Sequence, residues 1–147
     1  GHALTDFKPA DWQHVALVRT PDPVSGASTC IYINGVEDNC VSALLFQPSI
    51  ANAGTLQIGC ADDANGELNR YFVGAMDELR ISNIARYDSN FDPAKVFETD
   101  ENTVLLYHFD LDANQAVVDA SGNGLDATWN GTAIFTDAAP AITTCEQ

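Results

Sequence analysis

The sequence is poor in basic residues. Its 147 residues include 6 Lys and Arg against 21 Asp and Glu, which gives a formal net charge of −15. Binding to nucleic acid or to anionic lipid depends on basic side chains, so this composition argues against both as partners. An acidic surface favours a cation-rich medium, because bound cations relieve the repulsion between carboxylates. The alternative is that these carboxylates only keep the surface solvated.

Long apolar runs are also missing. No uninterrupted apolar stretch reaches the length of about 18 residues that a membrane-spanning helix needs, so we expect no membrane insertion. The apolar fraction of 46% is nevertheless enough for a core, and 147 residues suit one domain. We therefore expect a single domain over residues 1–147, with a C-terminal tail over about 137–147.

Motifs for catalysis are absent too. The sequence has no GxSxG elbow and no Gly-rich phosphate loop, and His14 and His108 lie within apolar, strand-like segments. Glycoside hydrolysis needs two carboxylates about 5–10 Å apart that flank a sugar, which on one strand means two acids on the same face. The adjacent acids Asp77 and Glu78 would point to opposite faces of a strand. We therefore predict that the chain is not an enzyme, and a β-glucanase-like hydrolase is the disfavoured alternative.

The four cysteines form no CxxC pair and no Cys/His cluster, so a zinc site is not expected. In an acidic, Asn- and Gly-rich chain they favour two disulfides and export from the cell. Of the three pairings, we favour Cys30–Cys40 with Cys60–Cys145; the alternative is four free thiols in a reducing compartment. The turn signal Asn34-Gly35 lies between Cys30 and Cys40, but simple hairpin register would not pair the two, so a bulge is required.

Short β-rich segments alternate with Gly, Asn, Asp and Pro turns along the whole chain. This pattern predicts an all-β fold, an antiparallel β-sandwich or barrel, with no long helix. The expected strands cover residues 11–20, 28–35, 36–46, 55–61, 71–82, 103–112, 115–121 and 125–136.

One acid is out of place in the predicted strand 71–82. Alternation puts Asp77 in an apolar row with Val73, Leu79 and Ile81. A carboxylate on an apolar face needs an ion pair, hydrogen-bond donors or a metal. We favour a cation from a neighbouring loop, and the alternative is an array of backbone N–H donors.

Three segments offer the oxygen ligands that calcium prefers: DDANGE at 62–67, FDLDAN at 109–114 and DASGNGLD at 119–126. Each could equally be a polar turn in which Asp and Asn cap their own backbone. The last segment is the strongest candidate, because two glycines allow carbonyls to converge on one point. Asp110 is the candidate ligand that we take from the second segment.

Several motifs together resemble a known family. The motifs WQHVALVRT, IYINGVED, LQIG and FVGAMDELRISNIARY follow one another over about residues 11–87. They resemble the second half of a laminin G-like, concanavalin A-like jelly-roll domain, and residues 103–128 resemble the segment that opens such domains. The resemblance implies two antiparallel sheets, an extracellular or cell-surface location, and a role in carbohydrate recognition or adhesion. It also implies a structural calcium, with Asp77 and Asp119 as ligands and Asn123 nearby.

The order of these motifs differs from the family pattern, because the opening-type segment follows the closing one. Either the chain is a compact or permuted variant, or it is a piece of a longer polypeptide. In the second case strands from another chain would complete the sandwich, and self-association by strand donation is expected.

Two functions are therefore open. The first is a secreted, non-catalytic module that binds a glycan or an extracellular protein, with Tyr71, Tyr87 and Trp129 as candidate stacking platforms. The second is a structural subunit of an extracellular oligomer or filament. Asn130 begins a glycosylation sequon, which matters only where a host uses it.

Overall fold

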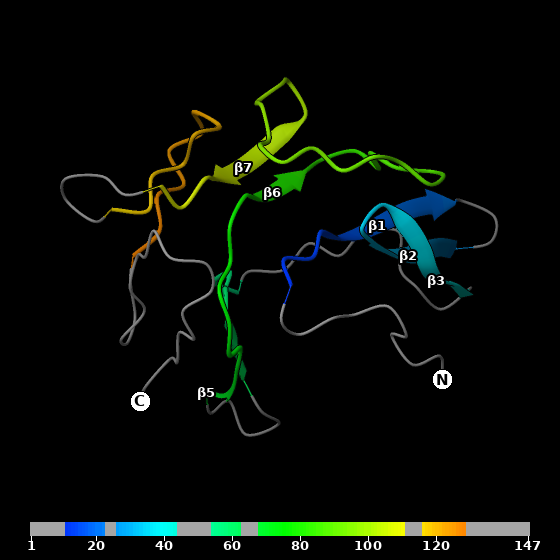
Figure 1. Ribbon diagram of the computed structural model, residues 1–147, viewed down its shortest axis with the longest axis horizontal. Helices are drawn as coiled ribbons and strands as arrows, with labels where there is room; N and C mark the ends of the chain where they lie inside the picture. Colours follow the sequence, from blue (N-terminus) through cyan, green and yellow to red (C-terminus); the bar gives the residue numbers. More distant parts are fainter. Residues whose placement is uncertain (1–10, 23–25, 44–53, 63–67, 111–115, 129–147) are drawn as a thin grey trace. The chain divides into compact units, whose positions relative to one another are not determined.

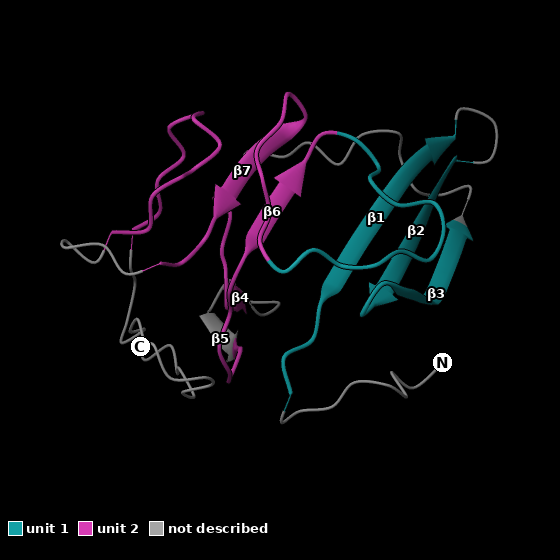
Figure 2. Ribbon diagram, turned by 45° about the horizontal axis from the view of Figure 1, so that its top comes forward, with its two compact units in different colours: residues 1–52, 84–95 teal, residues 53–83, 96–147 magenta. Residues whose placement is uncertain are grey.

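The computed structural model of the protein describes residues 11–22, 26–43, 54–62, 68–110 and 116–128 (Figure 1). These residues form seven antiparallel β-strands and no helix, which confirms the predicted all-β class. Within them, no helix has the length and hydropathy to cross a membrane. The chain forms two compact units, residues 1–52 with 84–95, and residues 53–83 with 96–147 (Figure 2).

The first unit contains a three-stranded sheet, in the order β1 (Val15–Asp22), β2 (Gly26–Ile33) and β3 (Val36–Ala43). Asn34 and Gly35 form the turn between β2 and β3, and both have positive φ, at 50° and 77°. Asn34 also fixes the turn to the beginning of β1: its N–H donates to the carbonyl of His14 (2.8 Å), and its Oδ1 accepts from the N–H of His14 (3.0 Å). The Asn-Gly signal therefore predicted this hairpin correctly.

The hairpin contains the bulge that the Cys30–Cys40 disulfide requires. Tyr32 pairs with Glu37, whereas the next pair is Ile31 with Asn39, so Asp38 is the extra residue on β3. This shift brings Cys30 opposite Cys40, and the two are joined by a disulfide. That half of the predicted pairing is confirmed. The other half stays a prediction, because Cys145 lies outside the described residues.

The two faces of this sheet differ in what covers them. Tyr32 is only 1% exposed, because the rings of Tyr87 and Phe91 lie over it, with centroids 6.3 and 5.6 Å away. We call the side of the sheet that carries Tyr32 the covered face. The segment that carries Tyr87 and Phe91 is attached to the β2–β3 turn, where the N–H of Phe91 donates to the carbonyl of Gly35 (2.9 Å). The opposite face carries several exposed apolar side chains and is called the open face, although Ala27 and Ile33 of β2 on this face are buried.

The second unit contains two strand pairs. In the first, β4 (Cys60–Asp62) pairs with β5 (Leu68–Tyr71), and in the second, β6 (Leu79–Ser82) pairs with β7 (Thr103–Tyr107). Leu105, Tyr107 and Val117 form the buried core of this unit, and side chains packed around them are Ile58, Leu79, Phe109 and Ala127. Among the described residues, the segments around 117 and 127 contribute an isolated bridge between Val117 and Ala127. Residues 116–121 therefore do not form the expected strand, and most of the second expected strand, 125–136, lies outside the described residues.

The predicted strand over residues 71–82 is not continuous. Its ends form parts of β5 and β6, but residues 72–78 between them belong to neither strand. Glu78 has a φ of 52°, a left-handed conformation that a β-strand does not contain. Asp77 consequently lies before the strand and is exposed, instead of lying on a buried apolar row.

Candidate functional site

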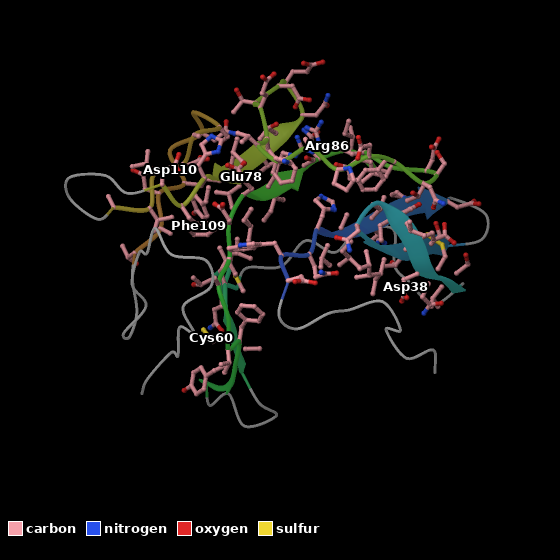
Figure 3. All side chains as sticks on the ribbon, in the orientation of Figure 1. Asp38, Cys60, Glu78, Arg86, Phe109 and Asp110 are labelled. Atoms are coloured by element: carbon pink, nitrogen blue, oxygen red, sulfur yellow. A yellow bond between two sulfur atoms is a disulfide. The ribbon has the colours of Figure 1, made fainter. Side chains whose placement is uncertain are left out.

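Four polar residues lie near one end of the β6–β7 ladder. Leu79, the first residue of β6, pairs with Tyr107, the last residue of β7. The residues just beyond this pair are therefore neighbours: Asp77 and Glu78 on one side, and His108 and Asp110 on the other. We call these four residues the acidic end. Figure 3 labels Glu78 and Asp110 on this part of the chain.

The backbone at the acidic end is unusual on both sides of the ladder. Glu78 and Phe109 are both non-glycine residues with positive φ, at 52° and 58°. Such a conformation costs on the order of 1–3 kcal/mol for a non-glycine residue. The cost is tolerated because Glu78 and Phe109 are each held by neighbours: Glu78 by hydrogen bonds, and Phe109 by the core around Tyr107. Two strained residues next to a group of acids are typical of a site that positions side chains.

Both carboxylate oxygens of Glu78 are engaged. Oε2 accepts the N–H of Phe97 (2.7 Å), and Oε1 lies 2.8 Å from Nδ1 of His108. The Phe97 ring in turn lies under the guanidinium of Arg80, 4.3 Å from the ring centroid. Glu78 thus joins three segments of the second unit.

Asp77 has a different environment. Its Oδ1 accepts the N–H of Glu78 (3.0 Å), a local hydrogen bond. Although the residue is exposed, partial desolvation of the carboxylate raises its pKa, and the charges of Glu78 and Asp110 raise it further, whereas the Glu78 N–H and His108 lower it. Ionised Asp77 and Asp110 therefore repel each other, and a bound cation would relieve this repulsion.

Asp119 is the buried carboxylate of the second unit, with 6% of its surface exposed. Its Oδ1 accepts the backbone N–H groups of Leu106 (3.1 Å) and Ser121 (3.0 Å). Its Oδ2 accepts the Ser121 hydroxyl (2.8 Å) and the N–H of Leu125 (3.1 Å). Although burial alone would raise the pKa of Asp119, these donors outweigh it and lower the pKa to about 2.

Asn123 completes the same loop. Its Nδ2 donates to the carbonyls of Thr103 (3.2 Å) and Val104 (3.0 Å), and to Oγ of Ser121 (3.1 Å). The side chain therefore ties the loop to the beginning of β7. Asp119 and Asn123, which were predicted together, are indeed part of one hydrogen-bonded loop, which we call the Asp119 loop.

The predicted calcium ligands thus belong to two different environments. Asp119 already accepts four hydrogen bonds, so a cation there would have to displace protein donors. Asp77 and Asp110 are exposed, and each has oxygen lone pairs available to a hard cation. The donor chemistry of the acidic end therefore fits calcium better than that of the Asp119 loop, and calcium binding stays a prediction.

The predicted stacking platforms lie in three places. Tyr87 is stacked on Phe91, with centroids 3.5 Å apart and an interplanar angle of 4°, so its ring packs within the first unit. Tyr71 is half-buried at the end of β5, opposite Cys60. Trp129 lies outside the described residues.

Phe72 is an exposed aromatic side chain that the sequence analysis did not select as a stacking platform. The structure leaves 41% of it exposed. Its ring lies against Gly74, because a Cβ built on Gly74 would be 2.8 Å from Cζ of Phe72. The neighbouring side chains of Val73 and Met76 are exposed as well. An aromatic followed two residues later by glycine was the signal available in the sequence.

The antiparallel strands and the absence of helix in the described residues place the protein in the all-β sandwich class. Comparison with known families gives the more specific assignment, because residues 2–90 match a laminin G-type family described as the concanavalin A-like lectin/glucanases superfamily. The chain belongs to this superfamily. No curated protein and no solved structure gave a significant match.

Proposed function

We propose that the protein is an extracellular, non-catalytic module that binds a glycan or polysaccharide, and that Asp77 and Asp110 hold a structural calcium. Membership of a superfamily of lectins and glucanases supports carbohydrate as the ligand. The Cys30–Cys40 disulfide supports an oxidising compartment outside the cell. The proposal that the module is non-catalytic is supported by the environment of the Glu78 carboxylate.

Glu78 is the obvious partner for Asp77 in acid–base chemistry, but its carboxylate is already engaged. One oxygen accepts the N–H of Phe97 and the other contacts His108. A glycosidase needs one carboxyl group as a proton donor and a second as a nucleophile or base. Using Glu78 in this way would break contacts that hold the second unit together. Hydrolysis of a β-glucan by the purified protein, lost in Glu78→Gln, would overturn this part of the proposal.

Calcium binding can be tested at the acidic end. Addition of calcium should raise the melting temperature, and EDTA should reverse the increase. It should also lower the pKa of Asp77, because the cation stabilises the ionised carboxylate. NMR titration of the side-chain carboxyl would follow this change. Asp77→Asn should abolish the increase in melting temperature. Asp92→Asn, the same change at an exposed acid of the first unit, should leave both the increase and the change in the pKa of Asp77 intact.

Phe72 is the side chain that we propose for stacking on a sugar ring. Aromatic side chains stack on the apolar faces of sugars, and Phe72 is 41% exposed although its ring lies against Gly74. Phe72→Ala should reduce binding to glycans on an array or by calorimetry at least about tenfold, from the loss of roughly 1.5 kcal/mol. Trp12→Ala is the matched control, since Trp12 is 52% exposed in the other unit. Equal losses in both variants, or no glycan bound by the wild type, would contradict the proposal.

The open face of the β1–β2–β3 sheet favours a second function, that of a structural subunit. The strand register places Val15, Leu17, Val36 and Val41 on this face, and their side chains are 55%, 71%, 53% and 46% exposed. An apolar sheet face of this kind usually has a protein partner. We propose a second copy of the chain as that partner, in line with the expected self-association.

Light scattering at several concentrations tests this alternative. The expected result is an oligomer that Leu17→Arg dissociates, because the charge would be buried at the contact. Thr20→Arg is the control, since Thr20 belongs to the same strand but to the other face. A strict monomer at all concentrations would leave only the binding module.

A further inference from the structure

Three potential metal ligands meet on the β2–β3 hairpin: Cys30, Glu37 and Cys40. One ligand atom from each residue, the two sulfurs and a carboxylate oxygen, lies within 4.8 Å of the other two. Within the described part of the chain, these three residues are the group of His, Cys, Asp or Glu side chains whose ligand atoms lie close enough together to hold a metal ion. In the structure the two sulfurs are joined as a disulfide.

The bulge is what brings Glu37 to the two cysteines. Residues three apart on a regular strand point to opposite faces, so Glu37 and Cys40 would be separated by the sheet. The extra residue, Asp38, restores the alternation: Glu37 pairs with Tyr32 and Cys40 pairs with Cys30. Because Cys30 and Tyr32 are two apart on β2, all these side chains lie on the covered face.

Glu37 is also held in place. Its backbone N–H donates to Oδ1 of Asn90 (3.0 Å), from the segment that packs on the covered face. Burial raises the pKa of Tyr32, and the charge of Glu37 and its hydrogen bond to the Tyr32 side chain raise it further. The Glu37 carboxylate therefore lies at Tyr32 and next to the cysteine pair, although the residue is exposed.

We propose that reduction of the Cys30–Cys40 disulfide converts this part of the hairpin into a binding site for zinc, with the two thiolates and the Glu37 carboxylate as ligands. Thiolate sulfur and carboxylate oxygen are both ordinary zinc ligands, and water would complete the tetrahedron. The strand pairing that allows the disulfide keeps the two sulfurs adjacent after it is broken. Disulfide and metal are mutually exclusive, so the hairpin has two closed states.

Conversion of the disulfide into the zinc site requires one external reductant, a dithiol. The dithiol transfers two electrons and two protons to the Cys30–Cys40 bond, which yields two thiols, and the reductant becomes a cyclic disulfide. Zinc then displaces the two thiol protons as the zinc–sulfur bonds form. Cys40 and Glu37 are exposed and Cys30 is half-buried, so both the reductant and the metal can reach the hairpin.

The test uses the full chain with Cys60→Ala and Cys145→Ala, so that Cys30 and Cys40 are the remaining thiols. After reduction with a dithiol and its removal under anaerobic conditions, Zn²⁺ is titrated by calorimetry, and Cd²⁺ is used to detect thiolate-to-metal charge transfer. We expect one metal per chain and no binding before reduction. Glu37→Gln should weaken binding at least about tenfold, as loss of even an indirect ligand contact does.

Asp38→Asn is the matched control, because it removes the same charge at the neighbouring bulge residue, which is not one of the three ligands. It should leave the zinc affinity within about twofold. Circular dichroism of each reduced variant checks that the strands persist, and zinc should raise the melting temperature of the reduced chain. If Glu37→Gln and Asp38→Asn weaken binding equally, or if zinc binds only to an unfolded reduced chain, the proposed site is wrong.

Discussion

The carboxylate of Asp119 should account for a large part of the stability of the second unit. The change Asp119→Asn keeps the size of the side chain but replaces one acceptor oxygen with an N–H₂ group. If the remaining oxygen keeps the contacts with Leu106 and Ser121, the new amide faces the N–H of Leu125, which is also a donor. The loop then contains a donor without an acceptor, and the charge that attracted all four donors is lost.

The size of the effect follows from two contributions. The pKa of Asp119 is lowered from 3.8 to about 2, which corresponds to roughly 2 kcal/mol, and solvent screening reduces this to about 1–2 kcal/mol. An unsatisfied buried N–H costs a further 1–3 kcal/mol or so. We therefore expect Asp119→Asn to lower the free energy of unfolding at pH 7 by about 2–5 kcal/mol, measured by urea denaturation with circular dichroism.

The pH dependence gives the sharper result. Because the pKa of Asp119 is lower in the folded state, its contribution is complete above the unfolded value near 3.8 and is lost as the pH falls through about 2. The charge-dependent part of the difference between wild type and Asp119→Asn should therefore shrink from pH 4 to pH 2. Asp126→Asn is the control, since its amide oxygen can still accept the N–H of Asp119, as Oδ1 does at 2.8 Å. A loss below about 0.5 kcal/mol for Asp119→Asn, or a difference that does not vary over this pH range, would refute the reasoning.

Two further substitutions test the contacts that hold each unit. Gly35→Ala should cost about 2 kcal/mol or more of stability, since φ is 77° and the new Cβ would lie against the carbonyl of Phe91. Gly122→Ala is the control: its φ is 83° but the space around it is open, so it should cost only about 1 kcal/mol. Equal losses of the two variants in thermal denaturation would show that the contact with Phe91 is unimportant. Glu78→Gln should cost about 0.5–1.5 kcal/mol, because it removes the charge that contacts His108 and retains an acceptor. Urea denaturation would show an unchanged or increased stability if the Glu78–His108 contact contributes nothing.

The hairpin of the first unit was predictable because its signals are local. Asn34-Gly35 specifies the turn, and the spacing of Cys30 and Cys40 specifies a bulge once the two are assumed to be joined. What covers the sheet was not predictable. Tyr87 was interpreted as a loop residue that could stack on a sugar, but it packs with Phe91 on Tyr32, more than fifty positions away in the sequence. Nothing in the pattern around Tyr87 indicates such a distant partner.

The acidic end was predicted only in part. Asp77 and Asp110 were selected as metal ligands, and the structure places both beyond the Leu79–Tyr107 pair. The contact between Glu78 and His108 was missed, because it depends on the register of β6 against β7. The alternating pattern predicted a continuous strand through Glu78, and this prediction is wrong. Glutamate has no preference for the left-handed conformation that Glu78 adopts, so its position in the sequence gives no sign of it. Tertiary contacts, not the local sequence, impose that conformation.

The Asp119 loop shows why a glycine-rich acidic segment is ambiguous before the structure is known. Gly122 and Gly124 have φ of 83° and 72°, and such left-handed residues were expected to turn carbonyls toward a cation. In the structure the groups that converge are the N–H donors of Leu106, Ser121 and Leu125, and the centre of the loop is a carboxylate. Backbone turns of this kind can present either polarity, because each peptide has a donor and an acceptor on opposite sides. The proposed calcium site therefore rests on Asp77 and Asp110. An effect of EDTA that survives Asp77→Asn would instead favour the Asp119 loop as the site.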